Sequence, residues 1–339
     1  MKQITAETLY EKLKHVKVAA NTCLFTEEKC AKMAPLINEI NALKEEKNAV
    51  VLTHSYVSPE IIYGVSDYVG DSYELSKNAK EASADIIVFS AVKFMAETAK
   101  LLNPTKEVRV PNKLNGCSLA DSITGKDVKE LRQKHPDHTF VCYINTTADV
   151  KANCDVCVTS SNVYHIVETI PNDKIFFLPD KLMAQNVIME MKKRGVNKEI
   201  LYSEGTCYVH EQYDPEMIQY LRLENPNVKV LSHPECNSAV LNDSDYVGST
   251  SQMINYVKTT DAESFFMLTE CGLTSRLQLE VPEKKFIGSC TMCKYMKSNT
   301  LEDVLRVLKQ PDTEDIIQID QRMSERALNC IDAMFDYTK

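Results

Sequence analysis

The stretch AVVLTHSY at residues 49–56 joins a run of apolar and β-branched residues directly to a polar cluster. A run of this length and composition predicts a buried β-strand over residues 49–53. His54 and Tyr56 then lie at the carboxyl end of that strand, where open parallel sheets bind their ligands. A helical segment follows, and a second short strand leads to the turn GDS at residues 70–72. The stretch therefore predicts the first part of an α/β unit that carries a site.

The same plan occurs twice more along the chain. Residues 139–145 (TFVCYIN) and 228–235 (VKVLSHPE) also run from a strand into a polar cluster, and a helix, a short strand and a Ser/Thr-rich turn follow each. His54, Tyr143 and His233 hold the matching polar positions, and they are 89 and 90 residues apart. A repeat at a fixed period indicates repeated structural units. The sequence therefore predicts three similar domains.

The second half of each unit is an apolar strand, a helix and a further strand that leads to a cysteine. The apolar strands are expected at residues 86–89, 175–178 and 265–268. The cysteine follows the matching polar residue by 63 residues at Cys117, by 64 at Cys207 and by 60 at Cys293. Cys290 lies three residues before Cys293 and is the alternative in the third unit. Because these cysteines hold matching positions, we expect three thiols to converge on one point.

Alternating strands and helices predict three-layer α/β/α domains, each with a short parallel sheet. Three such units predict a pseudo-threefold arrangement in which the strand ends face a central active site. Thr5 and Thr26 are expected to cap helices before the first unit. The expected domains are an N-terminal helical extension at 1–48, α/β repeats at 49–138, 139–227 and 228–310, and C-terminal helices at 311–339.

Composition restricts the class of protein further. The 339 residues are 44% hydrophobic and carry a net charge of −9, without a Lys/Arg-rich stripe, so a nucleic-acid partner is not expected. Residues 1–17 lack the apolar core of a signal peptide, and the apolar run at 86–92 is too short to cross a bilayer. We therefore expect a cytoplasmic protein without a membrane partner, whose 12 cysteines are reduced thiols or metal ligands.

Three converging thiols could hold zinc or an iron–sulfur cluster. Zinc sites usually pair two C-x-x-C knuckles, and the two in this chain, Cys154–Cys157 and Cys290–Cys293, lie far apart in the sequence. A [4Fe-4S] cluster with three thiolate ligands leaves one iron open, and an open metal position can act as a Lewis acid. This arrangement favours dehydration over electron transfer, because electron carriers usually use four ligands.

Further polar residues at the strand ends could complete such a site. A histidine and a carboxylate beside a metal suit proton transfer, and each of these side chains alone could instead be structural. The candidates are His54, Tyr56, Tyr143, Asn145, His210, His233 and Glu235. Ser72, Ser160 and Thr250 lie in turns that open helices. They could be ordinary N-caps, or their helix N-termini could bind phosphate and carboxylate groups.

Long ordered motifs over residues 49–305 resemble the quinolinate synthetase A family. They are His54–Tyr56, Val69–Ser72, Phe94–Lys100, Gly116–Asp121, Thr159–Asn162, Phe177–Asp180, Val209–Glu211, His233–Cys236 and Val247–Ser251. The resemblance implies condensation of iminoaspartate with dihydroxyacetone phosphate to quinolinate in NAD biosynthesis, with loss of phosphate and two waters. It also implies one [4Fe-4S] cluster per chain. An L-aspartate oxidase or dehydrogenase is the transient partner that would supply the imine.

The resemblance also assigns residues to roles. The implied cluster ligands are Cys117, Cys207 and Cys293. The implied catalytic residues are His54, Tyr56, Tyr143, His210 and Glu235. The implied substrate-binding residues are His54, Ser72, Tyr143, Asn145, Ser160, His233, Glu235 and Thr250. The family's usual His-Tyr-Tyr is His-Ser-Tyr here, and Lys294 replaces the usual proline after the last ligand.

Three questions stay open after this comparison of motifs. Some family members form a redox-active disulfide in a C-x-x-C such as Cys290–Cys293. Another [4Fe-4S]-dependent hydro-lyase acting on a small hydroxy acid is an alternative function, and a non-catalytic iron–sulfur sensor is a second one. A sensor would need a regulatory surface or a DNA-binding element, which the sequence does not indicate.

Overall fold

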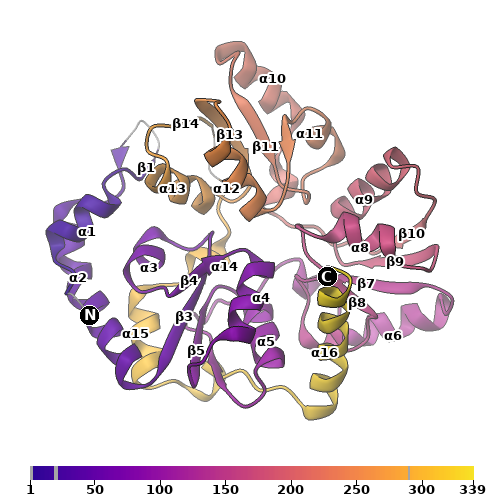
Figure 1. The fold of residues 1–339 in the computed structure, drawn as a ribbon, viewed down its shortest axis with the longest axis horizontal. Coiled ribbons are helices and arrows are strands. Elements are labelled where there is room, and N and C mark those ends of the chain that lie inside the picture. Colours follow the sequence, from indigo (N-terminus) through magenta and orange to yellow (C-terminus); the bar gives the residue numbers. More distant parts are fainter. Residues whose placement is uncertain (1–2, 19–21, 289–290) are drawn as a thin grey trace.

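The protein is described by a computed structural model that covers residues 3–18, 22–288 and 291–339. Three lobes surround a common centre in Figure 1, and each lobe is built on one four-stranded sheet. The strands of these sheets pair in parallel. When the strands of a sheet are numbered by their order along the chain, they lie side by side in the order second, first, third and fourth. The predicted fold class is confirmed: α/β, with three similar domains.

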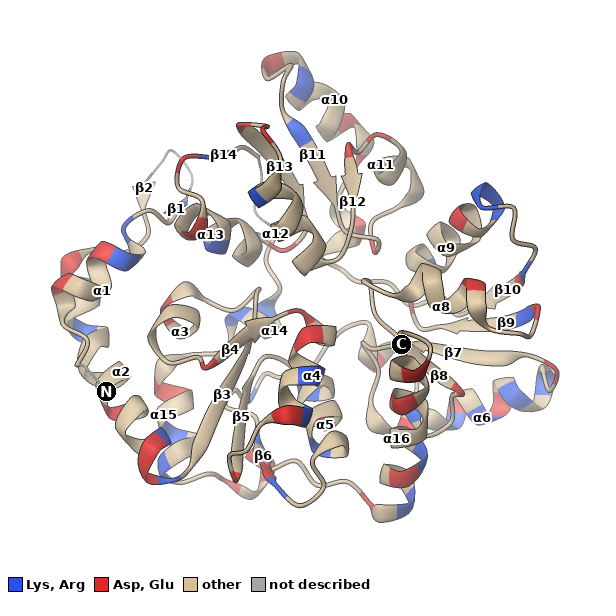
Figure 2. Cartoon of the chain, viewed as in Figure 1, with Lys and Arg blue, Asp and Glu red and all other residues tan. Residues whose placement is uncertain are grey.

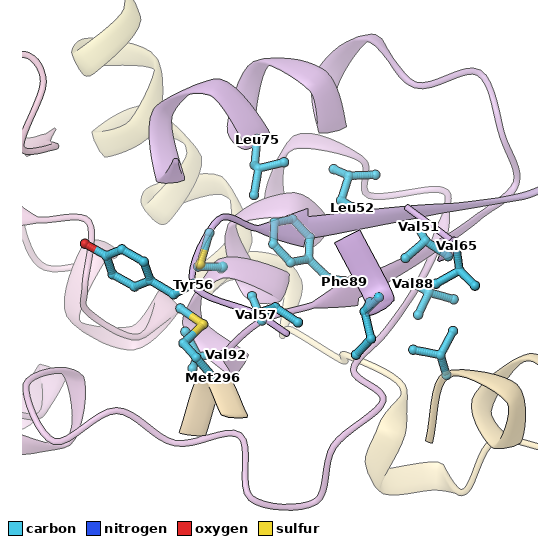
Figure 3. Packing of buried hydrophobic residues seen from close by; sticks show 14 of the residues in the cluster. Val51, Leu52, Tyr56, Val57, Val65, Leu75, Val88, Phe89, Val92 and Met296 are labelled. Carbon is cyan, nitrogen blue, oxygen red and sulfur yellow. The ribbon is translucent and has the colours of Figure 1, made fainter. Parts of the chain in front are cut away.

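The first sheet has the order β4-β3-β5-β6. Its strands are β3 (Ala49–His54), β4 (Tyr68–Gly70), β5 (Ile86–Ser90) and β6 (Glu107–Arg109). Its helices are α3 (Pro59–Gly64), α4 (Ser72–Glu81) and α5 (Lys93–Leu102). Leu52 and Phe89 are buried, and Figure 3 shows them beside Leu75 of α4. Continuous apolar strands such as β3 and β5 suit a parallel sheet that is covered on both faces.

The second and third sheets repeat this order as β8-β7-β9-β10 and β12-β11-β13-β14. The second contains β7 (Thr139–Tyr143), β8 (Val156–Val158), β9 (Lys174–Leu178) and β10 (Glu199–Tyr202), with α6 (Gly125–Lys134), α7 (Ala148–Lys151), α8 (Val163–Thr169) and α9 (Lys181–Lys193). The third contains β11 (Lys229–Ser232), β12 (Tyr246–Val247), β13 (Ser264–Leu268) and β14 (Lys285–Phe286), with α10 (Pro215–Glu224), α11 (Ser238–Asn242), α12 (Thr250–Thr259) and α13 (Cys271–Glu280).

The segment before the first repeat contains α1 (Ala6–Leu13) and α2 (Glu27–Glu46). Thr5 and Thr26 cap these helices, as predicted, and each side-chain oxygen accepts a backbone N–H of the first turn. Between the helices lies a small antiparallel ribbon, β1 (Lys17–Val18) and β2 (Thr22–Cys23), which the sequence reasoning did not anticipate. Two-residue strands leave little periodic signal to detect.

The C-terminal segment returns to the first two domains. Its helices are α14 (Lys294–Lys297), α15 (Leu301–Lys309) and α16 (Gln321–Asp336). Helix α15 packs against α2 and β5, whereas α16 packs against α5, α7 and β8. Figure 1 shows α16 between the first and second lobes. The end of the chain therefore supplies outer layers to domains that begin far earlier in the sequence, and the domain boundaries stay predictions.

Charged side chains of both signs are interspersed over the outer helices in the view of Figure 2. Short 3₁₀ helices at Ala120–Ser122 and His210–Gln212 follow the cysteines of the first two repeats, and a third lies at Thr313–Asp315. Over the part of the chain that the structure describes, every helix is too short or too polar to span a membrane.

Candidate active site

A cavity lies between the three domains, and its volume is about 620 Å³ when the open solvent at its mouth is included. Each of the thirteen site residues named from the sequence lines it. They are His54, Tyr56, Ser72, Cys117, Tyr143, Asn145, Ser160, Cys207, His210, His233, Glu235, Thr250 and Cys293. Residues separated by up to about 240 positions in the sequence thus meet at one place. This meeting is a consequence of the repeat, because equivalent strand ends face the same centre.

Histidines from the first and third repeats hold equivalent positions and equivalent hydrogen bonds. His54 is the last residue of β3, and its Nδ1 accepts the backbone N–H of Tyr56 at 3.2 Å. His233 follows β11, and its Nδ1 accepts the backbone N–H of Glu235 at 3.4 Å. An accepting Nδ1 leaves the proton of the neutral ring on Nε2. Both rings can therefore donate from Nε2.

Two helices begin at the cavity, and the residues that cap them lie one position before Ser72 and Thr250. Asp71 caps α4 by accepting the backbone N–H groups of Tyr73 and Glu74, and Ser249 caps α12 in a capping box with Gln252. Ser72 and Thr250 are instead the first helical residues, one position further on. Their hydroxyls are thus not needed as caps and line the cavity, beside the N-terminal N–H groups that favour anions.

Glu235 is buried at the centre of a hydrogen-bond network, with 3% of its surface exposed. The Tyr143 hydroxyl donates to its Oε1 at 2.7 Å, and Nδ1 of His210 lies 3.0 Å from its Oε2. Burial alone would raise the pKa of this carboxyl. Electrostatic interactions with the imidazoles of His210 and His233, together with the hydrogen bonds from His210 and Tyr143, outweigh burial and hold the pKa of Glu235 well below its usual range. Glu235 is therefore ionised at neutral pH, which is the form that a base must have.

A continuous chain of hydrogen bonds joins Tyr56 to this carboxylate. The Tyr56 hydroxyl lies 2.6 Å from Oγ1 of Thr269, and the same oxygen lies 3.1 Å from Nε2 of His210. When Nδ1 of the neutral His210 ring donates to Glu235, Nε2 must accept, so Thr269 donates to His210 and Tyr56 donates to Thr269. Protons can thus pass between Tyr56 and Glu235 through two intermediate groups.

Sequence reasoning missed Thr269. It follows β13 directly and is buried. A polar residue at the carboxyl end of the third strand is the signal in the sequence that would identify it. The same signal would identify Glu270 and its counterpart Asp180, each two residues after a third strand and each the cap of the next helix.

The three cysteines of the cavity share one local geometry. Backbone N–H groups of the residues two and three positions further on lie near each sulfur and favour its thiolate form: those of Leu119 and Ala120 for Cys117, Val209 and His210 for Cys207, and Tyr295 and Met296 for Cys293. Such N–H groups stabilise thiolate ligands and tune a bound cluster. Burial raises the pKa of the Cys117 thiol to about 12 and raises the pKa values of Cys207 and Cys293 as well. A bound metal centre would supply the positive charge that ionises them.

Cys207 of the second repeat lies next to this hydrogen-bond network. Its Sγ lies 3.2 Å from Nδ1 of His210. The ligand atoms of Cys207, His210 and Glu235 all lie within 4.8 Å of one another. A metal centre on these thiols would therefore adjoin a base. Cys290 lies outside the described residues, and Cys293 is a free thiol in this structure.

A buried ion pair holds the third cysteine against Tyr56. Glu270 is fully buried, and its Oε1 accepts the backbone N–H of Cys293 at 3.2 Å. Its partner Lys297, at 3.2 Å, also donates to the carbonyl oxygen of Tyr56. At Gly272, a Cβ atom would approach that carbonyl to 2.4 Å, so only glycine allows this packing. The ion pair therefore fixes a candidate ligand and a candidate catalytic residue relative to each other.

Burial lowers the pKa of His54 to about 4 and that of His233 to about 3, so both rings are neutral at pH 7. In the unfolded chain a histidine titrates near pH 6.5. Between pH 6.5 and pH 4 the unfolded chain therefore binds more protons than the native protein, and stability is lost as the pH falls.

We expect His54→Asn to weaken this loss of stability, because asparagine does not titrate. The effect of His54 alone is at most about 3 kcal/mol at the acid end of the window. Thermal unfolding of cluster-free protein between pH 6.5 and pH 4 measures it. His165→Asn, at an exposed histidine, is the control. An equal pH dependence in wild type and His54→Asn would show that His54 is not buried in its neutral form.

Comparison with known proteins agrees with this geometry. The family model described as "Quinolinate synthetase A protein" matches residues 38–336. The quinolinate synthase of Sinorhizobium fredii is 41% identical over 326 residues, which are 96% of this chain and 87% of that protein. The quinolinate synthase of Caulobacter vibrioides is 41% identical over 307 residues (89% and 82%), and that of Xylella fastidiosa is 40% identical over 312 residues (92% and 90%).

The fold and the site together define one class of protein. It is an enzyme with three similar α/β domains around a cavity, in which three thiols lie beside a hydrogen-bond network. The family match and the identity over nearly the whole chain make the assignment specific. The chain belongs to the quinolinate synthetase A family, whose members are enzymes of NAD biosynthesis.

Proposed function

We propose that this protein condenses iminoaspartate with dihydroxyacetone phosphate to give quinolinate, phosphate and two waters. The reaction balances without an oxidant or a reductant. The observation that carries the proposal is that one thiol from each repeat lines the same cavity as the Tyr143–Glu235–His210 network. The relatives named quinolinate synthase support the choice of product.

We propose that Cys117, Cys207 and Cys293 hold one [4Fe-4S] cluster. The residues fit such a group, because three thiols with the same pattern of N–H donors surround one cavity. When bound, the cluster supplies an iron without a protein ligand, which acts as a Lewis acid on an oxygen that leaves as water. Three reduced thiols and an exposed iron suit the cytoplasm, the proposed location of the enzyme.

The chain's own residues bind and orient the substrates. Ser72 and Thr250 offer hydroxyls beside the N-terminal N–H groups of α4 and α12, which favour a phosphate or carboxylate. Ser160 and Asn145 add polar groups from the second domain. His54 and His233 donate from Nε2 to substrate oxygens. These contacts hold the two reactants in one orientation, which removes much of the entropic cost of a bimolecular step.

Proton transfer is assigned to the network around Glu235. Condensation requires a proton to leave carbon and other protons to reach the departing hydroxyls. The Glu235 carboxylate accepts a proton, and Tyr56, Thr269 and His210 carry protons along their hydrogen bonds. Tyr143 holds the carboxylate in place.

The test is quinolinate formation by anaerobically reconstituted protein supplied with both substrates. An aspartate oxidase or a dehydrogenase, the transient partner proposed to supply iminoaspartate, can generate this unstable imine in the assay. We expect product only when both substrates and the cluster are present, and loss of product after exposure to air. Protein with a full cluster and no product would refute this reaction. It would favour the alternatives, a [4Fe-4S]-dependent hydro-lyase or an iron–sulfur sensor.

A further inference from the structure

A second group of cysteines lies in the core of the second domain, away from the cavity. This thiol cluster consists of Cys142, Cys154, Cys157 and Cys330, and all four are buried. Cys142 on β7 pairs in register with Cys157 on β8, and Cys154 lies in the turn before β8. Cys330 belongs to α16, 188 residues away from Cys142 in the sequence. The C-terminal helix thus contributes one of four neighbouring thiols.

The sulfur of Cys142 is the centre of the thiol cluster. It lies 3.5 Å from the sulfur of Cys330, and the thiols of Cys154 and Cys157 are close enough to favour its thiolate form. The ammonium group of Lys151 is fully buried nearby, where it donates to the carbonyl oxygen of Ile144 at 2.8 Å. Burial opposes ionisation of Cys142, but the three neighbouring thiols and Lys151 outweigh it and lower its pKa. Cys142 is therefore the thiol of the cluster most suited to act as a nucleophile.

Four thiols could instead bind a metal ion, but their arrangement does not favour one. Tetrahedral ligands surround an empty point at similar distances from one another. Here three thiols are placed around the fourth sulfur. Over the described residues, three ligand atoms that all lie within 4.8 Å of one another are found at Cys207, His210 and Glu235. No three sulfurs of the thiol cluster lie that close together. The closest sulfur pair, Cys142 and Cys330, is better placed for a bond between two sulfurs.

We propose that Cys142 and Cys330 form a reversible disulfide that links α16 to the second sheet. The oxidant is a small peroxide or a low-molecular-weight disulfide. With hydrogen peroxide, the Cys142 thiolate attacks one oxygen and the O–O bond breaks. Hydroxide is the leaving group, and Cys142 becomes a sulfenic acid. The Cys330 sulfur then attacks the Cys142 sulfur, and the sulfenic oxygen leaves as water with the thiol proton. Two thiols lose two electrons in total, and the peroxide gains them.

A small oxidant reaches the cluster by local opening of α16 away from the second sheet. Cys154, at 9% exposure, is the least buried thiol of the group. The link would fasten α16, which packs against both α5 of the first domain and α7 of the second. It would also fix the end of β7, where Tyr143 follows Cys142 and reaches Glu235. The disulfide would therefore hold two domains and one wall of the cavity together.

The experiment is peptide mapping of the full chain, purified anaerobically with its cluster, before and after treatment with hydrogen peroxide. We expect a cross-linked peptide pair carrying Cys142 and Cys330, with the loss of two hydrogen atoms, which a reductant reverses. Cys330→Ala and Cys142→Ala should each abolish the link, whereas Cys30→Ala, at a buried helical cysteine outside the cluster, should retain it. Amide exchange in α16 should be slower in treated wild type than in Cys330→Ala treated in the same way.

Exposed Met292 reports whether the oxidant has acted. The proposal would be overturned if Met292 were fully oxidised while Cys142 and Cys330 still reacted as free thiols after unfolding. A Cys154–Cys157 disulfide in place of the expected link would overturn it too, as would one equivalent of zinc that protects all four thiols. None of these results depends on quinolinate formation, so this proposal can fail while the proposed function stands.

Discussion

Replacement of Cys293 by serine is expected to remove the iron–sulfur cluster and quinolinate formation together. Serine keeps the size of the side chain but offers a hydroxyl, which is a poor ligand for iron in a cluster. A lost partner of a metal ligand typically costs about 10–100-fold in affinity or activity, and loss of the ligand itself should cost more. Cys117→Ser and Cys207→Ser should behave alike, because backbone N–H groups at the same two relative positions lie near each of the three sulfurs. Iron and sulfide content, visible absorbance and turnover of reconstituted protein measure the effect.

Two further serine variants make this experiment decisive. Cys30 is buried in α2 and does not line the cavity, so Cys30→Ser should keep both cluster and activity. Cys290→Ser should also keep them, since Cys293 has the local geometry of the other two candidate ligands. A cluster that survives in Cys293→Ser and is lost in Cys290→Ser would reverse the assignment of the third ligand. Survival in all three ligand variants would refute the three-thiol site.

The repeat explains why so much of the site could be predicted. Each α/β unit has the same strand order, so residues at equivalent strand ends must face the same centre. The positions of His54, Tyr143 and His233 in the sequence therefore specified a meeting point in space. The period of the repeat can be recognised without any knowledge of side-chain contacts, because the apolar strands and their lengths indicate it directly.

Other features depend on tertiary contacts that the sequence does not encode locally. Thr269 matters because it stands between Tyr56 and His210, which come from different domains. Lys297 is significant only through its contacts with Glu270 and the Tyr56 carbonyl. Helix α15 has a clear amphipathic pattern, yet nothing in that pattern indicates that its apolar face covers the first sheet.

The caps show a smaller limit of the same kind. Asp71 and Ser249 cap the helices, and Ser72 and Thr250 come one residue later. Neighbouring polar residues have similar capping preferences, so the sequence could not choose between them. The choice has a functional consequence, because it leaves Ser72 and Thr250 in the cavity. Ser249 also donates to Asp71 at 3.2 Å, which joins the two caps across the first and third domains.

Glu235→Gln is expected to lower turnover by about two orders of magnitude or more while the cluster remains. Glutamine has nearly the same shape as glutamate, so its side-chain oxygen can still accept from the Tyr143 hydroxyl. It cannot accept and hold a proton at neutral pH, and its amide group donates where the carboxylate accepted from His210. The hydrogen-bond chain from Tyr56 through Thr269 and His210 then has no base at its end.

The cluster content of this variant shows whether a low turnover comes from lost chemistry or from lost structure. Unchanged iron content and visible absorbance, together with low turnover at saturating substrate, would assign Glu235 to proton transfer. Glu211→Gln is the matched control, because Glu211 is an exposed carboxylate next to His210 in the sequence and does not line the cavity. It should keep nearly full activity. Near-wild-type turnover in Glu235→Gln would refute the role as base. The protons would then have to move without this carboxylate, and another group of the cavity would be the base.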